Sequence, residues 1–214
     1  IAGIYTAFGG LKAVVYTDAI QAIILIVGCG VLTYLVYEKL DFSWETVVNS
    51  VPKAHFSVVR PLNDSAIPWP GLIMGVPLLG FWYWSTNQYI VQRILGSKSL
   101  NHARWGVILA GFLKIIPLFI MVFPGAMAVS LYPGLENSDA VFPTLVTEIL
   151  PMGMVGLVLA GLVSAILSSV DSALNSSSTL VVIDFIQPMK KDLSEKDIAK
   201  YGRITTIILM VIAA

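Results

Sequence analysis

The sequence predicts an all-α polytopic membrane protein. Of its 214 residues, 57% are hydrophobic and only 12% are charged, and the mean hydropathy is +0.83. A soluble domain usually carries about 25% charged residues, so this chain has roughly half that share. Long stretches without any charge recur along the sequence, and a helix of about 20 such residues is what the hydrocarbon core of a bilayer requires.

Four complete transmembrane helices are expected, at about residues 17–37, 68–94, 105–131 and 146–185. Shorter apolar runs at 1–8 and 204–214 predict partial helices at both ends. We therefore interpret residues 1–214 as a single membrane-domain fragment from inside a longer protein. The last of the four stretches is longer than a bilayer requires.

The charges between these stretches predict an orientation. Segments 93–104 and 189–203 carry three and five Lys or Arg residues, whereas segment 132–148 carries three acids and no basic residue. Cytoplasmic loops of membrane proteins are enriched in Lys and Arg, so the two basic segments are expected on the cytoplasmic side. The predicted location is the plasma or inner membrane, crossed several times.

Composition also excludes several classes of function. Thirteen basic residues balance thirteen acidic ones, so there is no net positive field to hold nucleic acid. The single cysteine, Cys29, cannot form a disulfide framework or a thiolate metal site. The sequence contains no HExxH or GxSxG motif. We therefore expect a transporter rather than an enzyme, without a cofactor, whose partners are the lipid bilayer and a small solute.

Three ionisable residues lie in or beside the apolar stretches, where burial is costly without a partner. Lys114 is either half of a structural ion pair or a donor that hydrogen-bonds a polar solute in a cavity. Asp171 is either a protonated or water-facing acid or a group on the route by which a cation leaves. Asp18 is either an acid favoured at a helix N-terminus or part of an ion pathway.

Small and hydroxyl residues form one face of the last predicted span. Ala165, Ser168, Ser169 and Ser172 recur at i, i+3, i+4 and i+7. Such residues allow two helices to approach closely. Alternatively, their hydroxyl and carbonyl oxygens suit a hard cation such as sodium, which serves here as a coupling ion rather than as a cofactor.

The second predicted span is unusual because it combines helix-breaking residues with aromatic ones. Pro77 removes a backbone hydrogen bond and Gly80 lowers helix propensity, which predicts a discontinuous helix. Broken helices mark solute sites in secondary transporters. Trp82, Tyr83 and Trp84 follow in the middle of the span, where they suit stacking on a sugar ring or gating a cavity better than anchoring at the membrane interface.

Together these stretches resemble the sodium:solute symporters, and within them the sodium/glucose cotransporter branch. The resemblance is carried by IYTAFGGLKAVVYTDAIQ, PWPGLIMG with FWYWSTNQYIVQR, FLKIIPLFIMVFPG and SAILSSVDSALNSSSTL, in the order of the family. It implies part of a LeuT-like fold of two inverted five-helix repeats.

The resemblance also implies roles for individual residues. The Ala165 carbonyl and the Ser168 and Ser169 hydroxyls match sodium ligands, and Asp18 matches an acid on the sodium route. Lys114 matches a lysine that hydrogen-bonds the sugar. Tyr83 matches the aromatic that closes the sugar from the cytoplasm, and Trp84 lies beside it.

Two positions depart from the family pattern. Gly80 replaces a polar side chain of the sugar-transporting relatives, and Asp171 replaces a small neutral or hydroxyl residue. The expected function is sodium-coupled symport of a glucose- or galactose-like sugar, or a polyol. The alternatives are a sodium symporter for a carboxylate or amino acid and a transport-dead solute sensor. A channel is disfavoured because the spans show no repeated polar rings.

Overall fold

The structure is a computed structural model that describes the backbone of residues 2–135, 137–190 and 192–213, with side chains from Phe8 onward. Residues 1 and 214, at the outer limits of the two partial helices expected from the sequence, lie outside the described residues, as do Glu136 and Lys191. Within the described ranges the fold is all-helical, with an isolated bridge between Arg60 and Pro68 and no named strand.

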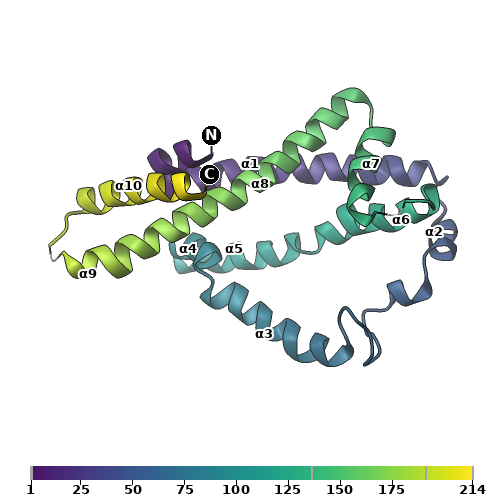
Figure 1. The fold of residues 1–214 in the computed structure, drawn as a ribbon, viewed down its shortest axis with the longest axis horizontal. Coiled ribbons are helices and arrows are strands. Elements are labelled where there is room, and N and C mark those ends of the chain that lie inside the picture. Colours follow the sequence, from purple (N-terminus) through teal and green to yellow (C-terminus); the bar gives the residue numbers. More distant parts are fainter. Residues whose placement is uncertain (1, 136, 191, 214) are drawn as a thin grey trace.

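Two long helices form the centre of the molecule. Helix α1 (Ala2–Glu38) and helix α8 (Met152–Leu180) cross each other obliquely in Figure 1 and pack closely. A Cβ atom added at Gly161 of α8 would meet the Leu25 Cα atom at 3.3 Å, and one added at Gly28 of α1 would meet a Val158 methyl carbon at 3.1 Å. Small residues on both helices therefore allow their backbones to approach.

Helix α1 begins well before the expected span. A non-helical residue, Gly10 (φ 57°, ψ −159°), bends it, in a left-handed conformation that glycine adopts without strain. Asp18 consequently lies two turns beyond this bend and inside a continuous helix, so its interpretation as a helix N-terminal acid is wrong. Helix α10 (Glu195–Ala213) packs against α1 and α8 at the end of the molecule that contains this bend.

The second expected span is divided. It contains a π-helical turn, η2 (Gly71–Gly75), then α3 (Val76–Phe81), a second π-helical turn, η3 (Trp82–Thr86), and α4 (Gln88–Leu95). The break lies at Asn87 (φ −74°, ψ 107°), whose side-chain oxygen accepts a hydrogen bond from the Tyr89 amide and so caps α4. The sequence placed the break near Pro77 and Gly80, which instead belong to α3.

Proline is accommodated by widening the helix before it. The π-helical turns η2, η4 (Leu118–Val122) and η6 (Val181–Ile186) each precede a helix with proline in its first turn, namely α3, α6 (Phe123–Leu131) and α9 (Gln187–Met189). Proline has no amide hydrogen for the carbonyl four residues earlier. At Pro124 that carbonyl belongs to Ile120, and the Thr33 hydroxyl of α1 lies 3.3 Å from it.

The fourth expected span starts later than the sequence indicated. Helix α7 (Val141–Ile149) ends before Pro151, and α8 begins at Met152, so the boundary near residue 146 falls within α7. The two helices are separate because Leu150 and Pro151 have extended backbone angles. Leu145 and Val146 of α7 are buried with Leu32 and Val36 of α1 in the main hydrophobic core.

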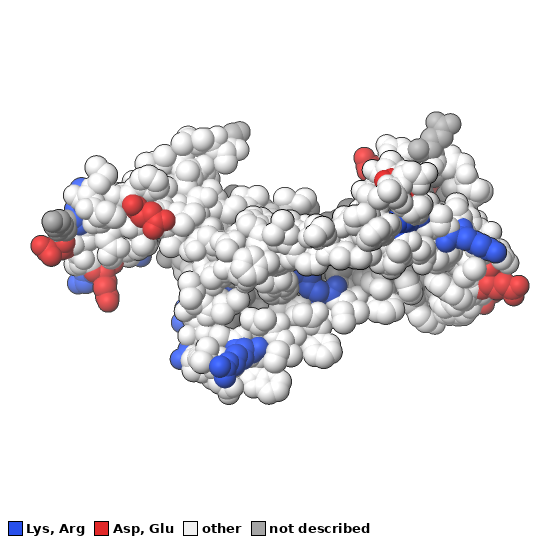
Figure 2. Space-filling model, turned by 90° about the horizontal axis from the view of Figure 1, so that it is seen from below, with Lys and Arg blue, Asp and Glu red and all other residues white. Residues whose placement is uncertain are grey.

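Three helical runs are long and apolar enough to cross a membrane: Phe8–Glu38, Leu100–Leu131, which includes α5 (Leu100–Leu113), and Met152–Met189. The run through 68–94 is absent from this set, and its helix is interrupted at Asn87. On the face shown in Figure 2, acidic side chains gather toward the two ends, and between them the charged side chains in view are basic. The chain is therefore that of a multi-pass membrane protein.

Candidate cation and solute sites

A small cavity lies between α1 and α8, with a volume of about 150 Å³. Its lining includes two polar side chains of α1, Asp18 and Gln21, and two expected sodium-site residues of α8, Ala165 and Ser168. Ala22 and Leu25 of α1 complete it. The Asp18 Oδ1 and Gln21 Oε1 atoms are buried and have no hydrogen-bond partner among the described residues. Buried oxygens without a donor are suited to a cation.

The three expected sodium ligands occupy different surroundings. Ala165 and Ser168 line the cavity, whereas the Ser169 side chain is exposed in this chain. The Ser169 hydroxyl donates a hydrogen bond of 3.1 Å to the Ala165 carbonyl. Ser169 is therefore connected to the cavity through the backbone of α8 and does not line it.

Asp171, the other acid expected on the ion pathway, is fully buried in α8. It is not among the residues that line the cavity between α1 and α8. Its role remains a prediction.

A second cluster joins residues that the sequence linked to the solute. The Lys114 Nζ atom lies 4.3 Å from the centre of the Tyr83 ring and 5.9 Å from that of the Trp84 ring. The two rings pack edge to face, with centres 5.3 Å apart. Their positions follow from the π-helical turn η3, which carries both rings, and from the end of α5, which Lys114 caps.

The structure also addresses the alternative interpretation of Lys114 as half of an ion pair. The two ion pairs found among the described residues are Arg60–Asp64 and Arg93–Asp18, and neither involves Lys114. Its cationic head instead faces aromatic rings, which attract it through their negative faces.

Gly80 lies close to one helical turn before Tyr83, in α3. A Cβ atom added there would meet nothing within 4 Å. Packing within this chain therefore does not require glycine at that position.

Arg93, which the sequence indicated only as a flanking charge, lies beside the cavity. The Arg93 Nη2 atom lies 2.5 Å from the Asp18 Oδ2 atom and 2.5 Å from the Ser172 hydroxyl oxygen. A guanidinium of α4 thus bridges α1 and α8 beside the cavity. The available signal was the pair Gln92–Arg93, two strongly polar residues at the end of an apolar segment.

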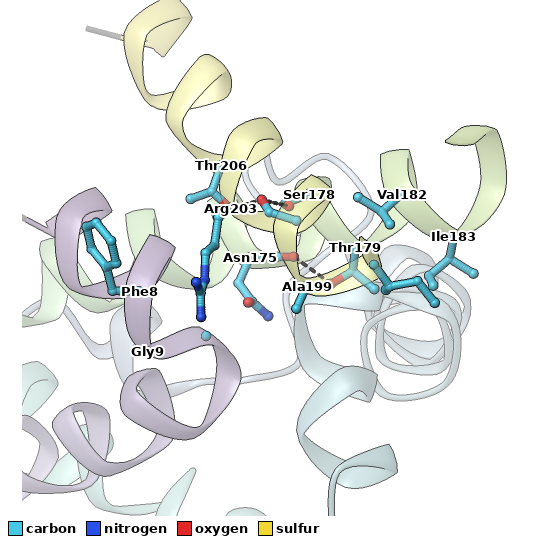
Figure 3. Close-up of a pocket in the computed structure, with 13 residues that line it drawn as sticks. Phe8, Gly9, Asn175, Ser178, Thr179, Val182, Ile183, Ala199, Arg203 and Thr206 are labelled. Atoms are coloured by element: carbon cyan, nitrogen blue, oxygen red, sulfur yellow. Dashed lines mark hydrogen bonds between the residues drawn. The ribbon is translucent and has the colours of Figure 1, made fainter. Parts of the chain in front are cut away.

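The polar contacts continue along α8 to a larger cavity. The Asn175 side-chain amide donates a hydrogen bond of 2.9 Å to the Gln92 side-chain oxygen, and Gln92 reaches the Ser172 carbonyl at 3.4 Å. Asn175 also lines a cavity of about 340 Å³ enclosed by the start of α1, α8, η6 and α10 (Figure 3). The Arg203 side chain points into this cavity beside Asn175.

Comparison with known families identifies the chain over its whole length. The family model described as Sodium:solute symporter family matches residues 1–214. Sodium/glucose cotransporter 4 of Danio rerio is 36% identical over 246 aligned positions, which cover 100% of this chain and 37% of that protein. Sodium/myo-inositol cotransporter 2 of Homo sapiens is 36% identical, with 100% of this chain and 36% of that protein covered. The chain thus spans little more than a third of these relatives.

A solved structure confirms the fold. The substrate-bound, outward-open structure of a Na+-coupled sialic acid symporter superimposes with a TM-score of 0.85 at 24% identity, covering 98% of this chain and 47% of that one. The fold is therefore part of a LeuT-like transporter core, as the sequence predicted. The family is one of transporters and not of enzymes. With a family match from the first residue to the last, this chain belongs to the sodium:solute symporter family.

Proposed function

We propose that this chain forms part of a sodium-coupled symporter that imports a sugar or polyol of the glucose or galactose type by alternating access. The observation that carries the proposal is the cavity between α1 and α8. It places a carboxylate and an amide oxygen of α1 opposite Ala165 and Ser168, within two of the longest apolar helices of the chain. The Asp18 Oδ1 and Gln21 Oε1 atoms, which have no hydrogen-bond partner among the described residues, suit a dehydrated alkali cation in that position.

The proposed sodium site consists of the Ala165 carbonyl with the Ser168 and Ser169 hydroxyls, and Asp18 lies on the route of the ion. The buried Asp18 Oδ1 atom, which has no hydrogen-bond partner within the described part of the chain, supports that position for the acid. Asp171 is assigned to the same ion pathway. Sodium would enter down its gradient, and the membrane potential adds about 2.3 kcal/mol per charge per 100 mV.

The proposed solute site consists of Lys114, Tyr83 and Trp84. Lys114 would donate hydrogen bonds to solute hydroxyls, and the two rings would stack against the apolar face of a sugar ring and close it from the cytoplasm. The contact of Lys114 with both rings supports a common site. At Gly80, which offers no side chain, water or another group would supply one hydrogen bond.

The names of the relatives support a sugar or polyol, since they include sodium/glucose and sodium/myo-inositol cotransporters. The proposed location is the plasma or inner membrane.

A second candidate solute is a carboxylate or an amino acid. It is favoured by Lys114, whose ammonium forms neither of the two ion pairs among the described residues. A cation without an acidic partner can hold a carboxylate directly.

Uptake by sealed vesicles that contain the full-length transporter tests both candidates. We expect labelled glucose, galactose or myo-inositol to accumulate under an inward sodium gradient and not when potassium replaces sodium. Accumulation of a labelled carboxylate or amino acid alone would establish the second candidate. Solute-dependent currents without accumulation would overturn symport in favour of a sensor.

A further inference from the structure

Arg93 contacts residues that lie between the two cavities described above. Asp18 is one of the residues that line the cavity of about 150 Å³, and Asn175 is one of those that line the cavity of about 340 Å³. Between them lies one polar stripe of α8, with residues at i, i+3, i+7 and i+10: Ala165, Ser168, Ser172 and Asn175. Arg93 and its neighbour Gln92 contact the middle of this stripe through Ser172. A cation that leaves the smaller cavity along the stripe therefore meets the guanidinium.

The two oxygens of the Asp18 carboxylate have different surroundings. Its Oδ2 atom accepts a hydrogen bond from Arg93, while its Oδ1 atom is buried with no donor among the described residues, in a residue that lines the smaller cavity. A carboxylate paired with a guanidinium attracts a second cation less strongly, because the two positive charges repel each other at close range. Binding of a cation at Asp18 and binding of Arg93 to Asp18 therefore oppose each other.

Arg93 also has partners on its own helix. Its Nη1 atom donates a hydrogen bond of 3.0 Å to the Tyr89 carbonyl, and the guanidinium carbon lies 5.4 Å from the centre of the Tyr89 ring. The side chain can give up Asp18 and remain satisfied against Tyr89. The contacts with Tyr89 are made in the same conformation as the contact with Asp18.

We propose that Arg93 is a tethered cation that competes with the coupling cation for Asp18. When the cavity is empty, Arg93 holds Asp18 and Ser172 and joins α1 to α8; when sodium is bound, the guanidinium releases Asp18 and keeps its contacts with Tyr89. Arg93 is thus a positioning residue that disfavours the return of released sodium. This inference rests on the proposed sodium symport.

The test measures two sodium concentrations for the full-length transporter. The first gives half-maximal thermal stabilisation of the purified protein, and the second gives half-maximal solute uptake in vesicles. Arg93→Gln removes the competing charge, so both concentrations should fall, by roughly fivefold or more for a coupling of ordinary strength. In the Asp18→Asn background the same substitution should have no effect. A structural ion pair predicts the opposite sign, because its loss would distort the site and raise both concentrations.

Two further variants keep the test decisive. Ser172→Ala removes the second hydrogen bond of Arg93 Nη2 and should lower the sodium requirement in the same direction, by a smaller factor, even where Arg93→Gln does not fold. Arg104→Gln removes an exposed arginine of α5, which is expected on the same side of the membrane, and controls for the general surface charge. It should leave the sodium requirement unchanged.

The outcomes separate this inference from the proposed function. An unmodified transporter that shows no sodium-dependent stabilisation or uptake would overturn both. Suppose instead that the unmodified transporter responds normally to sodium. If Arg93→Gln then leaves the two sodium concentrations unchanged or raises them, or if Arg104→Gln lowers them as much as Arg93→Gln does, the competition alone is overturned.

Discussion

The Lys114 Nζ atom lies 4.3 Å from the centre of the Tyr83 ring, although the two residues come from different predicted spans. This contact places a cation at the end of α5 against the π-helical turn η3 of the preceding span. Hydrogen-bond donors and flat apolar rings are the two features that a sugar site combines. The contact is therefore the geometric basis for testing Lys114 as a solute-binding residue.

Lys114→Ala in the full-length transporter should raise the solute concentration for half-maximal uptake by roughly tenfold, because a hydrogen bond from a charged group contributes about 1.5–3 kcal/mol. The sodium concentration for half-maximal uptake should change much less. Uptake at varied solute and sodium concentrations measures both. Lys114→Arg keeps the charge and its attraction to the rings and should retain more affinity. Loss of folded protein in both variants would instead indicate a structural role.

Ser168→Ala should raise the sodium requirement more than Ser169→Ala does, since Ser168 lines the cavity and Ser169 is tied to the Ala165 carbonyl. The double variant should require the most sodium. Sodium titration of uptake at saturating solute measures the effect, and Ser177→Ala, at an exposed position of α8, is the matched control. Sodium dependence that does not change in the double variant would show that these serines only allow close helix packing.

Gly161→Ala should destabilise the transporter by about 1–3 kcal/mol, because the new methyl group would lie 3.3 Å from the Leu25 Cα atom and force α1 and α8 apart. Gly156→Ala, on the same helix, meets nothing within 4 Å and should be neutral or slightly stabilising, since alanine favours helix. Thermal unfolding of the purified full-length protein compares the two. Equal melting temperatures would contradict the close approach at Gly161.

The membrane-helix architecture was largely predictable from sequence because apolar length is a direct requirement of the bilayer. The boundaries were less so. Pro77 was expected to break its helix, but the chain widens into a π-helical turn before it, and the break falls at Asn87, where a side-chain oxygen can cap the next helix. Which polar side chain hydrogen-bonds the backbone groups at a helix break depends on neighbouring helices, and the sequence of a single segment does not reveal these neighbours.

The candidate sites were likewise predictable in part. Helical spacing predicted that Ala165 and Ser168 share a face, and both line one cavity. The pairing of Asp18 with Arg93 could not be deduced in this way, because 75 residues separate the partners and no periodicity connects them. Such a contact depends on how α1 and α4 each pack against α8.

The Asp18–Arg93 pair also has a consequence for biosynthesis. An acid inside a membrane helix is costly to insert alone. The ribosome produces Asp18 first, Arg93 75 residues later and Ser172 a further 79 residues after that. The charge partner of Asp18 is thus synthesised well before α8 can cover α1. Arg93 is therefore available as a charge partner for Asp18 before α8, against which α1 and α4 both pack, has been translated.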